Sequence, residues 1–323
     1  MIGEVSGGRG VLVRVATWNL ENLFRPGGAA GPGSEAEYET KLVALAATIG
    51  QLKPDVLGVQ EVGSTDALAD LVAKLGGDWH TELADPDRRG IRVGLLSRLP
   101  LSEVQQSAGY LDGLQPVQVD DDGTTITTMS RPALRARIDV AATPVDVVCC
   151  HLKSKLLSFP GGRFFTSDED ERARFAVYAL GRRAAEAATI RGIATQLLNG
   201  QGQQRAVVVL GDLNDTERSA TTAMLNGPGG SEMGTPGFDR PDQGDATRLW
   251  NLAPAIPAER RFTRTYRGRP EMIDHILVSR ALLDGLGNVD TIDVGAGSVN
   301  DTPGDRAGDP ASDHRPVITD LTL

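Results

Sequence analysis

Val207-Val208-Val209-Leu210-Gly211-Asp212-Leu213-Asn214-Asp215 is the stretch from which the fold of this chain is best inferred. Its four apolar residues, three of them β-branched, predict a buried strand that delivers acids and an amide to its end. Oxygen ligands gathered in this way suit a hard cation such as Mg2+. The same residue types also favour turns and helix caps, so this stretch alone leaves a purely structural role open. The functional interpretation gains weight if other strands end in the same way.

The composition is that of a folded protein with an acidic surface. Of the 323 residues, 40% are hydrophobic and 24% are charged, which excludes a disordered chain. There are 33 Lys and Arg residues against 43 Asp and Glu residues, so the formal net charge is −10. That charge disfavours a loose electrostatic coat on nucleic acid. It does not exclude an enzyme that meets phosphates locally through a metal and a few arginines.

Nothing in the sequence predicts a membrane protein or an exported one. No apolar run approaches the ~20 residues of a membrane span, and the polar residues at the start differ from a signal peptide. Cys149 and Cys150 are neighbours in a β-like run, so they point to opposite faces and are poorly placed to bridge each other. We therefore expect free thiols and a reducing compartment, the cytoplasm. We also expect the protein to be a monomer. No linker separates two domains, and we expect a single domain over residues 11–323 after a flexible N-terminus at 1–10.

Strand patterns recur along the whole chain. The segments that read as strands are 11–19, 56–60, 92–97, 124–129, 133–140, 145–151, 272–279 and 316–323. The turns between 124 and 145 are short, which predicts antiparallel pairing there. A helix is predicted after Ser34, which forms a capping box with Glu37, and a second helix covers 66–75.

A locally basic segment follows the strand that ends at His151. Residues 152–183 hold seven basic side chains against four acidic ones. The first part must be loop, and the remainder has helical spacing. Its apolar stripe is predicted to contain Ala176, Leu180, Ala184, Ala187 and Ile190. Because the segment begins beside His151, we expect it to approach substrate phosphates, starting with Lys153.

Polar residues with catalytic chemistry occur at or near the ends of several of these strands. They are Asn19, Glu61, His151, Asp212, Asn214, Asp274, Asp313 and His314. One such strand end has a simple structural explanation as a turn or cap. A repeated occurrence, in a chain with only four histidines, favours a shared site.

The ordered set of short motifs resembles the endonuclease/exonuclease/phosphatase superfamily, which includes deoxyribonucleases, abasic-site endonucleases, neutral sphingomyelinases and inositol-polyphosphate 5-phosphatases. The motifs are Thr17-Trp18-Asn19, Gln60-Glu61, His151-Leu152-Lys153, Gly211-Asp212-Leu213-Asn214, Ile273-Asp274-His275 and Ser312-Asp313-His314-Arg315-Pro316. Each motif is weak alone, but together they span nearly the whole chain. The resemblance implies an α/β (α+β) fold, a four-layered sandwich of two packed, mostly antiparallel β-sheets flanked by helices.

The resemblance also implies a divalent cation, Mg2+ or Mn2+, as cofactor. It assigns Glu61 as a metal ligand, with Asn19 and Asp313 close to the ion or acting through water. Mg2+ keeps much of its own water and needs only one or two carboxylates, so such a sparse ligand set is sufficient.

The catalytic roles follow from the same resemblance. Asp212 and Asn214 would position and activate the attacking water, while Asp215 would cap the next helix. His314 would touch the phosphate or take a proton, with its ring oriented by Asp274. His275 follows Asp274 in a strand, so it points to the opposite face and is expected to be structural.

Two further residues would face the substrate, and one expected group is missing. His151 would contact a non-bridging oxygen or the leaving group, and Arg131 matches an arginine that grips phosphate in the deoxyribonuclease branch. In that branch a carboxylate orients the histidine equivalent to His151, but Arg92 stands near the corresponding place. No aromatic-rich loop is recognised beside the site, and aromatic residues make up only 4% of the chain.

Three functions are compatible with these motifs. The first is a metal-dependent phosphodiesterase or nuclease acting on nucleic acid. The second is a phosphatase or phosphodiesterase for a small phosphorylated metabolite or a lipid headgroup, which the acidic charge and the few aromatics favour. The third is a binding module that kept the fold without catalysis, against which the complete set of water-activating residues argues.

Overall fold

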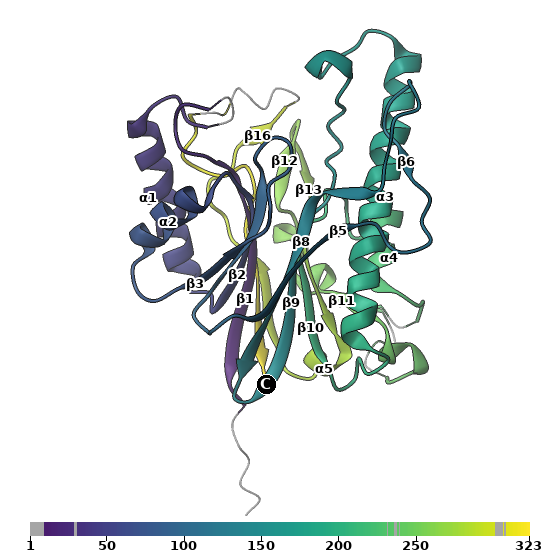
Figure 1. Ribbon diagram of the computed structural model, residues 1–323. Helices are drawn as coiled ribbons and strands as arrows, with labels where there is room; N and C mark the ends of the chain where they lie inside the picture. Colours follow the sequence, from purple (N-terminus) through teal and green to yellow (C-terminus); the bar gives the residue numbers. More distant parts are fainter. Residues whose placement is uncertain are drawn as a thin grey trace, which may run out of the picture.

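Two six-stranded sheets packed against each other form the centre of the molecule in the computed structural model (Figure 1). The structure describes residues 10–28, 31–230, 232–235, 238, 240–300, 306 and 308–323. The expected flexible N-terminus lies, apart from Gly10, outside the described residues. The first sheet has the order β15-β17-β1-β2-β4-β3, and the second has the order β11-β14-β10-β9-β8-β5.

The strands of the first sheet are β1 (Leu12–Leu23), β2 (Val56–Val62), β3 (His80–Leu83), β4 (Arg92–Ser97), β15 (Leu286–Thr291) and β17 (Val317–Thr322). Those of the second are β5 (Ser102–Gly109), β8 (Thr128–Val140), β9 (Thr143–His151), β10 (Ala206–Asp212), β11 (Leu249–Asn251) and β14 (Asp274–Ser279). Two small sheets join β12 (Arg264–Tyr266) with β13 (Arg269–Glu271) and β16 (Ser298–Val299), and β6 (Val117–Gln118) with β7 (Thr125–Ile126).

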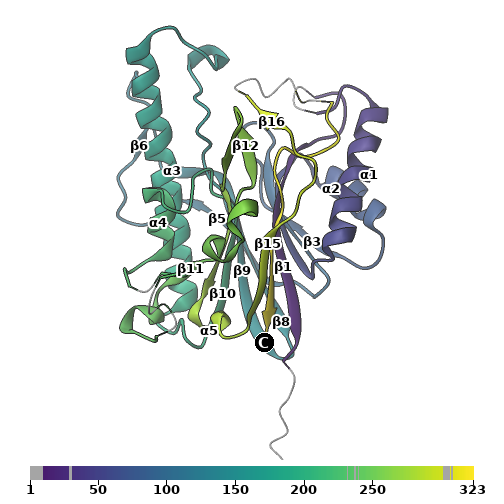
Figure 2. The ribbon, with the colours of Figure 1, turned by 180° about the vertical axis from the view of Figure 1, so that it is seen from behind.

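Helices cover the outer face of each sheet, which gives four layers (Figures 1 and 2). Helices α1 (Glu35–Leu52) and α2 (Thr65–Leu75) pack on the first sheet, where Leu45 of α1 shares a core with Leu57 of β2. Helices α3 (Glu169–Leu198) and α4 (Ala220–Asn226) pack on the second, where Ile190 of α3 shares a core with Val209 of β10. The short helix α5 (Arg280–Leu283) follows β14. The predicted four-layered sandwich is confirmed.

A third core fills the space between the sheets, and alternation along the strands builds it. Val208 and Leu210 of β10 point inward, whereas Val207 and Val209 point to α3. Such a strand is apolar on both faces, which explains the unbroken run that opens the sequence motif.

The strand directions place the polar strand ends at one edge. Strand β1 is parallel to β2, and β9 is parallel to β10, so the carboxyl ends within each pair lie side by side. Strands β14 and β17 are antiparallel to β10 and β1, so they begin where those strands end. The edge that carries Asn19 and Asp212 therefore also carries Asp274 and the residues just before β17.

The helix boundaries follow local capping chemistry. The side chain of Ser34 accepts a hydrogen bond from the backbone of Glu37 at the start of α1, as predicted, and the helix ends at Lys53 in the left-handed conformation. Asp168 caps α3 by accepting from the backbone of residues 170 and 171.

The structure corrects two sequence predictions at this level. Segments 124–129 and 133–140 are not two equal strands, because β8 runs without a break from 128 to 140. The apolar stripe of α3 begins with Phe175 and Ala179, and the predicted Leu180 is 50% exposed.

Cys149 and Cys150 are free and buried on opposite faces of β9, as their alternation predicted. Among the described residues, no helix combines the length and the apolar character that a bilayer crossing requires.

Candidate active site

The candidate site lies at the edge where the two parallel strand pairs end. His151 and Asp212 are the last residues of β9 and β10 and stand opposite each other in register. Asp212 also stands opposite Asp274, the first residue of β14. The second sheet alone therefore brings together three of the predicted residues.

Asn19 links the two sheets. Its amide Nδ2 donates to Glu61 Oε1 over 3.2 Å within the first sheet and to Asp212 Oδ2 over 3.0 Å in the second. Asn19 is 1% exposed, and the indole of its neighbour Trp18 donates to the carbonyl of His314 over 2.8 Å. Trp18 thus fixes the end of β1 against the segment that holds His314.

The Gly211-Asp212-Leu213-Asn214 motif turns so that two side chains face the site. Asn214 adopts a left-handed conformation with φ 52°, and its backbone N–H donates to Asp212 Oδ1 over 2.9 Å. The Asn214 side chain donates to the carbonyl of Leu152 over 3.0 Å. Burial raises the pKa of Asp212 to about 7, and the charge of Asp274 acts in the same direction.

His314 and Asp274 form a buried pair. His314 Nδ1 lies 2.7 Å from Asp274 Oδ2, and both side chains are at most 4% exposed. Burial alone would lower the pKa of His314, but the carboxylates of Asp274 and Asp313 outweigh it and raise the pKa to about 10. The imidazole is therefore a cation at neutral pH.

Thr263 sets the geometry of this pair. Its hydroxyl accepts from the backbone N–H groups of Ile273 and Asp274, and its carbonyl accepts from the N–H of Arg315. Thr263 is fully buried. One residue outside every recognised motif thus holds the two motifs together.

His151 faces Asp212 and keeps a free ring nitrogen. Its Nε2 lies 3.3 Å from Asp212 Oδ2, and its Nδ1 is buried without a hydrogen-bond partner in the described part of the chain. Burial lowers the pKa of His151 well below its usual value, and the charge of Arg131 adds to this effect. Arg92 does not replace the missing carboxylate, since its guanidinium donates to the carbonyl of Ala84.

The two residues predicted to bind substrate are engaged with the protein. Arg131 is 7% exposed and donates to the carbonyls of His151 and Leu152 over 3.1 and 3.0 Å. Lys153 Nζ donates to the carbonyls of Ser154 and Leu156 over 2.9 and 2.7 Å. Burial lowers the pKa of Lys153 to about 7. Both residues order the end of β9, and their role in substrate binding stays a prediction.

Glu186 of α3 completes the support of this strand end, and sequence reasoning missed it. Its side chain is fully buried and accepts from the backbone N–H groups of Ser130 and Lys153 over 3.0 and 2.5 Å. The signal in the sequence was a carboxylate directly beside Ala187 of the apolar stripe.

Carboxylates gather beside Glu61, and sequence reasoning missed one of them, Glu21, and the buried Lys41 among them. Glu21 accepts from the backbone of Asp313 over 2.8 Å and from the guanidinium of Arg306 over 2.7 Å. Burial raises the pKa of Glu21 to about 7, although the hydrogen bond from Arg306 opposes this. Lys41 of α1 is 4% exposed, and burial lowers its pKa while Glu21, Asp313 and Glu61 all act to raise it.

These donors fit a hard divalent cation. Three carboxylates act on one region that holds Asn19 as well, and carboxylate and amide oxygens are the ligands that Mg2+ prefers. A second cluster contains Asp212, Asp274 and His314, whose ligand atoms lie within 4.8 Å of one another. It is the one group of this kind among the described residues, so the assignment of the ion to Glu61 stays a prediction.

Asp215 and His275 have structural roles. The predicted cap by Asp215 is wrong, because α4 begins only at Ala220 and is preceded by Ser219. Asp215 instead binds Arg183 of α3 over 3.1 Å. His275 is fully buried, between the side chain of Asn251 and the carbonyl of Asp215, as its outward position on the strand predicted.

The basic segment 152–183 offers less free charge than its composition indicates. Its ion pairs with described residues include Arg163 with Glu171, Arg172 with Glu169, Arg174 with Asp121, Arg183 with Asp215, and Lys155 with Asp215 and Glu271. The same segment carries two exposed aromatic side chains. Phe164 and Phe165, in the loop between β9 and α3, are 52% and 78% exposed.

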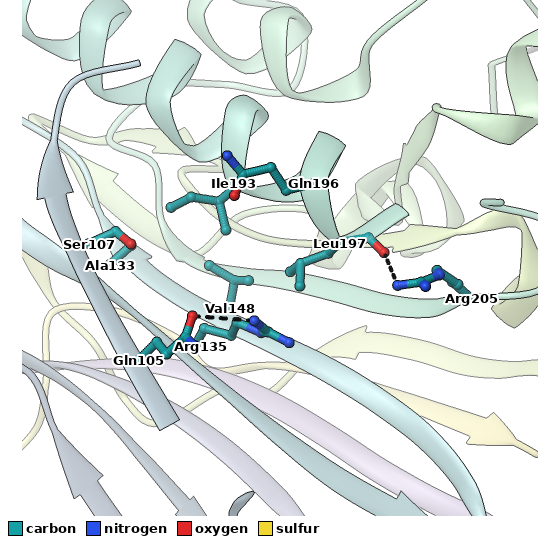
Figure 3. A pocket seen from close by; sticks show the side chains of 9 residues that line it. All are labelled: Gln105, Ser107, Ala133, Arg135, Val148, Ile193, Gln196, Leu197 and Arg205. Carbon is teal, nitrogen blue, oxygen red and sulfur yellow. Dashed lines mark hydrogen bonds between the residues drawn. The ribbon is translucent and has the colours of Figure 1, made fainter. Parts of the chain in front are cut away.

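A cavity of the protein lies away from these residues. It has a volume of about 260 Å³ and lies between α3 and the strands β5, β8 and β9 (Figure 3). None of the predicted site residues line it. Its two arginines are held by the protein, Arg135 by Asp146 and Arg205 by the carbonyl of Leu197. The cavity therefore does not change the location of the candidate site.

Solved structures with the same fold support this arrangement of elements. The human Nocturnin catalytic domain with bound sulfate is 16% identical, with 96% of this chain and 94% of that chain covered and a TM-score of 0.56. Truncated Caenorhabditis elegans TDP2 is 15% identical, with coverages of 97% and 98% and a TM-score of 0.56. The mannosyl-6-phosphatase Bt3783 of Bacteroides thetaiotaomicron is 15% identical, with coverages of 96% and 100% and a TM-score of 0.57.

Sequence comparison gives the family. No protein with a curated description matches the chain significantly. The sequence profile of the Endonuclease/Exonuclease/phosphatase family, however, matches residues 16–314, from β1 to His314. The chain therefore belongs to the endonuclease/exonuclease/phosphatase family, whose members are generally metal-dependent hydrolases of phosphoesters.

Proposed function

We propose that this protein is a metal-dependent phosphodiesterase that acts on nucleic acid. The observation that carries the proposal is the continuous contact from Glu61 through Asn19 to Asp212, with the Asp274–His314 pair in the same buried cluster. A module that only binds phosphate has no need of a buried carboxylate with a pKa of about 7. A group with that pKa suits proton transfer at neutral pH.

Each residue of the cluster has a separate role in hydrolysis. Asp212, held by the backbone of Asn214, takes a proton from the attacking water. His314 is cationic, so it stabilises the negative charge that develops on the phosphoryl oxygens. Asp274 keeps the ring of His314 oriented through its 2.7 Å contact. His151 is neutral and offers hydrogen bonding to a non-bridging oxygen or to the leaving group.

Glu61, Asn19 and Asp313 would hold Mg2+ or Mn2+. The ion supplies Lewis-acid stabilisation of the phosphoryl oxygens and of the leaving alkoxide when it is bound. Glu21 keeps Asp313 in place through the backbone of that residue.

The test of the proposal is hydrolysis of bis(p-nitrophenyl) phosphate. The wild type should be active with Mg2+ or Mn2+ and inactive in EDTA. Asp212→Asn should lose at least about 100-fold in kcat, because general-base catalysis contributes about 10²- to 10⁴-fold. The exposed Asp112→Asn is the matched control and should retain full activity. Unchanged turnover in Asp212→Asn, with a normal circular dichroism spectrum, would refute the mechanism.

A small phosphorylated metabolite or a lipid headgroup is the second candidate substrate. The net charge of −10 favours it, because an acidic surface repels a polyanion. Supercoiled plasmid discriminates the two: nicking in Mg2+ supports the nuclease, whereas intact plasmid together with phosphate release from monoesters supports the second candidate. Absence of all hydrolysis would leave the binding module as the explanation.

We further propose one domain over residues 11–323 that works as a monomer in the cytoplasm. The three cores share the two sheets, which supports a single unit. The two unbridged thiols are consistent with a reducing compartment. Sedimentation equilibrium tests the oligomeric state.

A further inference from the structure

A buried lysine lies on the packed face of α1, at a position where the helical spacing favours an apolar residue. Lys41 belongs to the same buried face as Tyr38 and Leu45, which contribute to the core on the first sheet. The side chain of Lys41 is nevertheless charged, and the residue is 4% exposed. Lysine is almost never buried so deeply unless its charge is compensated. Packing in the apolar core therefore does not explain a lysine at this position.

The charge of Lys41 acts on the carboxylates around Glu61. Burial lowers the pKa of Lys41, whereas Glu21, Asp313 and Glu61 all act to raise it. The effect is mutual, because burial raises the pKa of Glu21 and Lys41 is among the charges that oppose this. The ammonium forms no hydrogen bond or ion pair with any residue that the structure describes. Lys41 therefore acts on the three carboxylates through its electric field rather than through a direct contact.

The backbone after Asn19 holds two of these carboxylates in place. Glu21, Asn22 and Glu61 have left-handed backbones, with φ of 49°, 54° and 63°. Residues other than glycine rarely adopt this conformation. The N–H of Asn22 donates to Glu61 Oε2 over 3.0 Å, and the N–H of Glu21 donates to Asn19 Oδ1 over 2.9 Å. The carboxylates beside Lys41 therefore have defined positions and are not free to turn away from it.

Arg306, the other basic residue of this group, is bound in a different way. Its guanidinium donates to both carboxylate oxygens of Glu21, over 2.7 and 3.0 Å, and pairs with Asp309 over 2.8 Å. Arg306 thus compensates particular carboxylates by direct contact. Lys41 is engaged by no single carboxylate, so its positive charge acts on the group as a whole.

We propose that Lys41 is a resident cation of the metal site, which competes electrostatically with the divalent ion for the carboxylates around Glu61 and so lowers the affinity for that ion. This inference rests on the proposed function, because it takes the Glu61 group as the place of the ion. Two cations beside the same carboxylates repel each other, and salt screens buried charges much less than exposed ones. The lysine thus keeps the ion exchangeable.

The test measures binding of Mn2+ without turnover. Metal-free protein is titrated with MnCl2, and the free ion is followed by its electron paramagnetic resonance signal. Lys41→Met removes the charge and keeps a long unbranched side chain, so it should bind Mn2+ at least about tenfold more tightly than the wild type. Lys41→Arg keeps the charge and should bind within about threefold of the wild type. Lys53→Met, exposed at the end of the same helix, is the matched control and should bind as the wild type does.

The sign of the change separates an electrostatic role from a structural one. Removal of a lysine that only supports the fold would loosen the carboxylates and weaken Mn2+ binding. Unchanged or weaker binding in Lys41→Met would therefore overturn the proposal. Lys41→Gln, which keeps a polar end, is the second variant, with the same expected sign. Thermal unfolding gives an independent measure, because Mn2+ should raise the Tm of either neutral variant by more than it raises that of the wild type.

The location of the ion is tested in the same titration. Glu61→Gln should weaken Mn2+ binding at least about tenfold. Unchanged binding in Glu61→Gln would place the ion at the cluster of Asp212, Asp274 and His314, which would overturn this inference and leave metal-dependent hydrolysis standing. Conversely, a protein that shows the expected order of Mn2+ affinities but does not hydrolyse bis(p-nitrophenyl) phosphate would support the inference and refute only the catalytic proposal.

Discussion

At the residue scale, the contact between His314 and Asp274 joins a buried imidazole to a buried carboxylate. A histidine that is buried by itself loses its charge, but the two carboxylates near His314 reverse this and raise its pKa to about 10. The folded protein therefore binds a proton here that the unfolded chain releases above a pKa of 6.5. The stability contributed by this proton is complete below that value and is lost as the pH rises through about 10.

The contribution of His314 to the free energy of unfolding in EDTA should consequently fall as the pH rises from 7 to 9.5, by up to about 1.4 kcal/mol per pH unit. Lys153 acts in the opposite direction in this window, because its pKa in the folded protein, about 7, lies below the 10.5 of the free side chain. The test is therefore the difference between two proteins. The double variant Asp274→Asn/His314→Gln removes both partners, so no buried carboxylate is left alone. The slope of its free energy of unfolding against pH in the same window should be more positive than that of the wild type by up to about 1.4 kcal/mol per pH unit. Urea titrations at several pH values measure this.

The exposed His80→Gln is the control and should keep the wild-type slope. An equal slope in the double variant would show that His314 does not hold the proton. Asp212 does not contribute to this slope, because its raised pKa changes the free energy of unfolding mainly between pH 3.8 and about 7.

Sequence reasoning located the polar residues that the strand ends bring together, but not the residues that support them. Asn19, Glu61, His151, Asp212 and Asp274 could be found because a polar residue at the end of an apolar strand breaks a pattern. Glu21, Lys41, Glu186 and Thr263 carry no such signal. Their importance comes from contacts between segments far apart in the chain, which a one-dimensional pattern does not contain.

At the level of elements, α3 is both a layer of the fold and a support of the site. Glu186 reaches from the helix to the backbone of Ser130 and Lys153, and Arg183 reaches to Asp215. Two charged residues one turn apart thus connect α3 to the ends of β9 and β10.

Glu186→Gln should reduce the free energy of unfolding by about 1–3 kcal/mol, because the amide group that replaces one carboxylate oxygen faces a backbone N–H and leaves it unsatisfied. Denaturant titration measures the loss. Glu169→Gln, at the exposed start of the same helix, should change stability by less than about 0.5 kcal/mol. Similar losses in both variants would contradict the role of Glu186.

The predicted elements were those with long apolar patterns or clear caps. Strand β4 was predicted with its observed bounds, and α1 was recognised from Ser34 and Glu37. Strands β12, β13 and β16 were missed because they are two or three residues long and partly polar. They form by pairing with each other above the site, and the β-propensity of their residues does not predict them.

For the whole molecule, the distance between the two sheets is set at a few close contacts. Gly58 of β2 faces Leu210 of β10, and a Cβ at position 58 would lie 2.1 Å from Leu210 Cδ1 and 3.1 Å from Cys149 Sγ. A side chain there would push the sheets apart. The contact from Asn19 to Asp212 crosses the same interface, so the site depends on this spacing.

Gly58→Ala should therefore destabilise the protein by about 1–3 kcal/mol through overpacking. Gly50→Ala is the matched control, because a Cβ at that helical position meets open space and should stabilise α1 by about 0.5–1 kcal/mol. Thermal unfolding of the two variants checks both signs. A tolerated Gly58→Ala would mean that the sheets can separate without cost.

The place of β17 delays the completion of the first sheet during synthesis. This strand lies between β1 and β15 in that sheet, so β1 is synthesised long before the strand that pairs with it. Asp313 and His314 emerge just before that partner. A nascent chain can build the second sheet early, but it holds an open strand edge and an incomplete candidate site until translation has passed residue 322. A chain that stops before residue 313 thus lacks both the pairing of β1 with β17 and two residues of the candidate site.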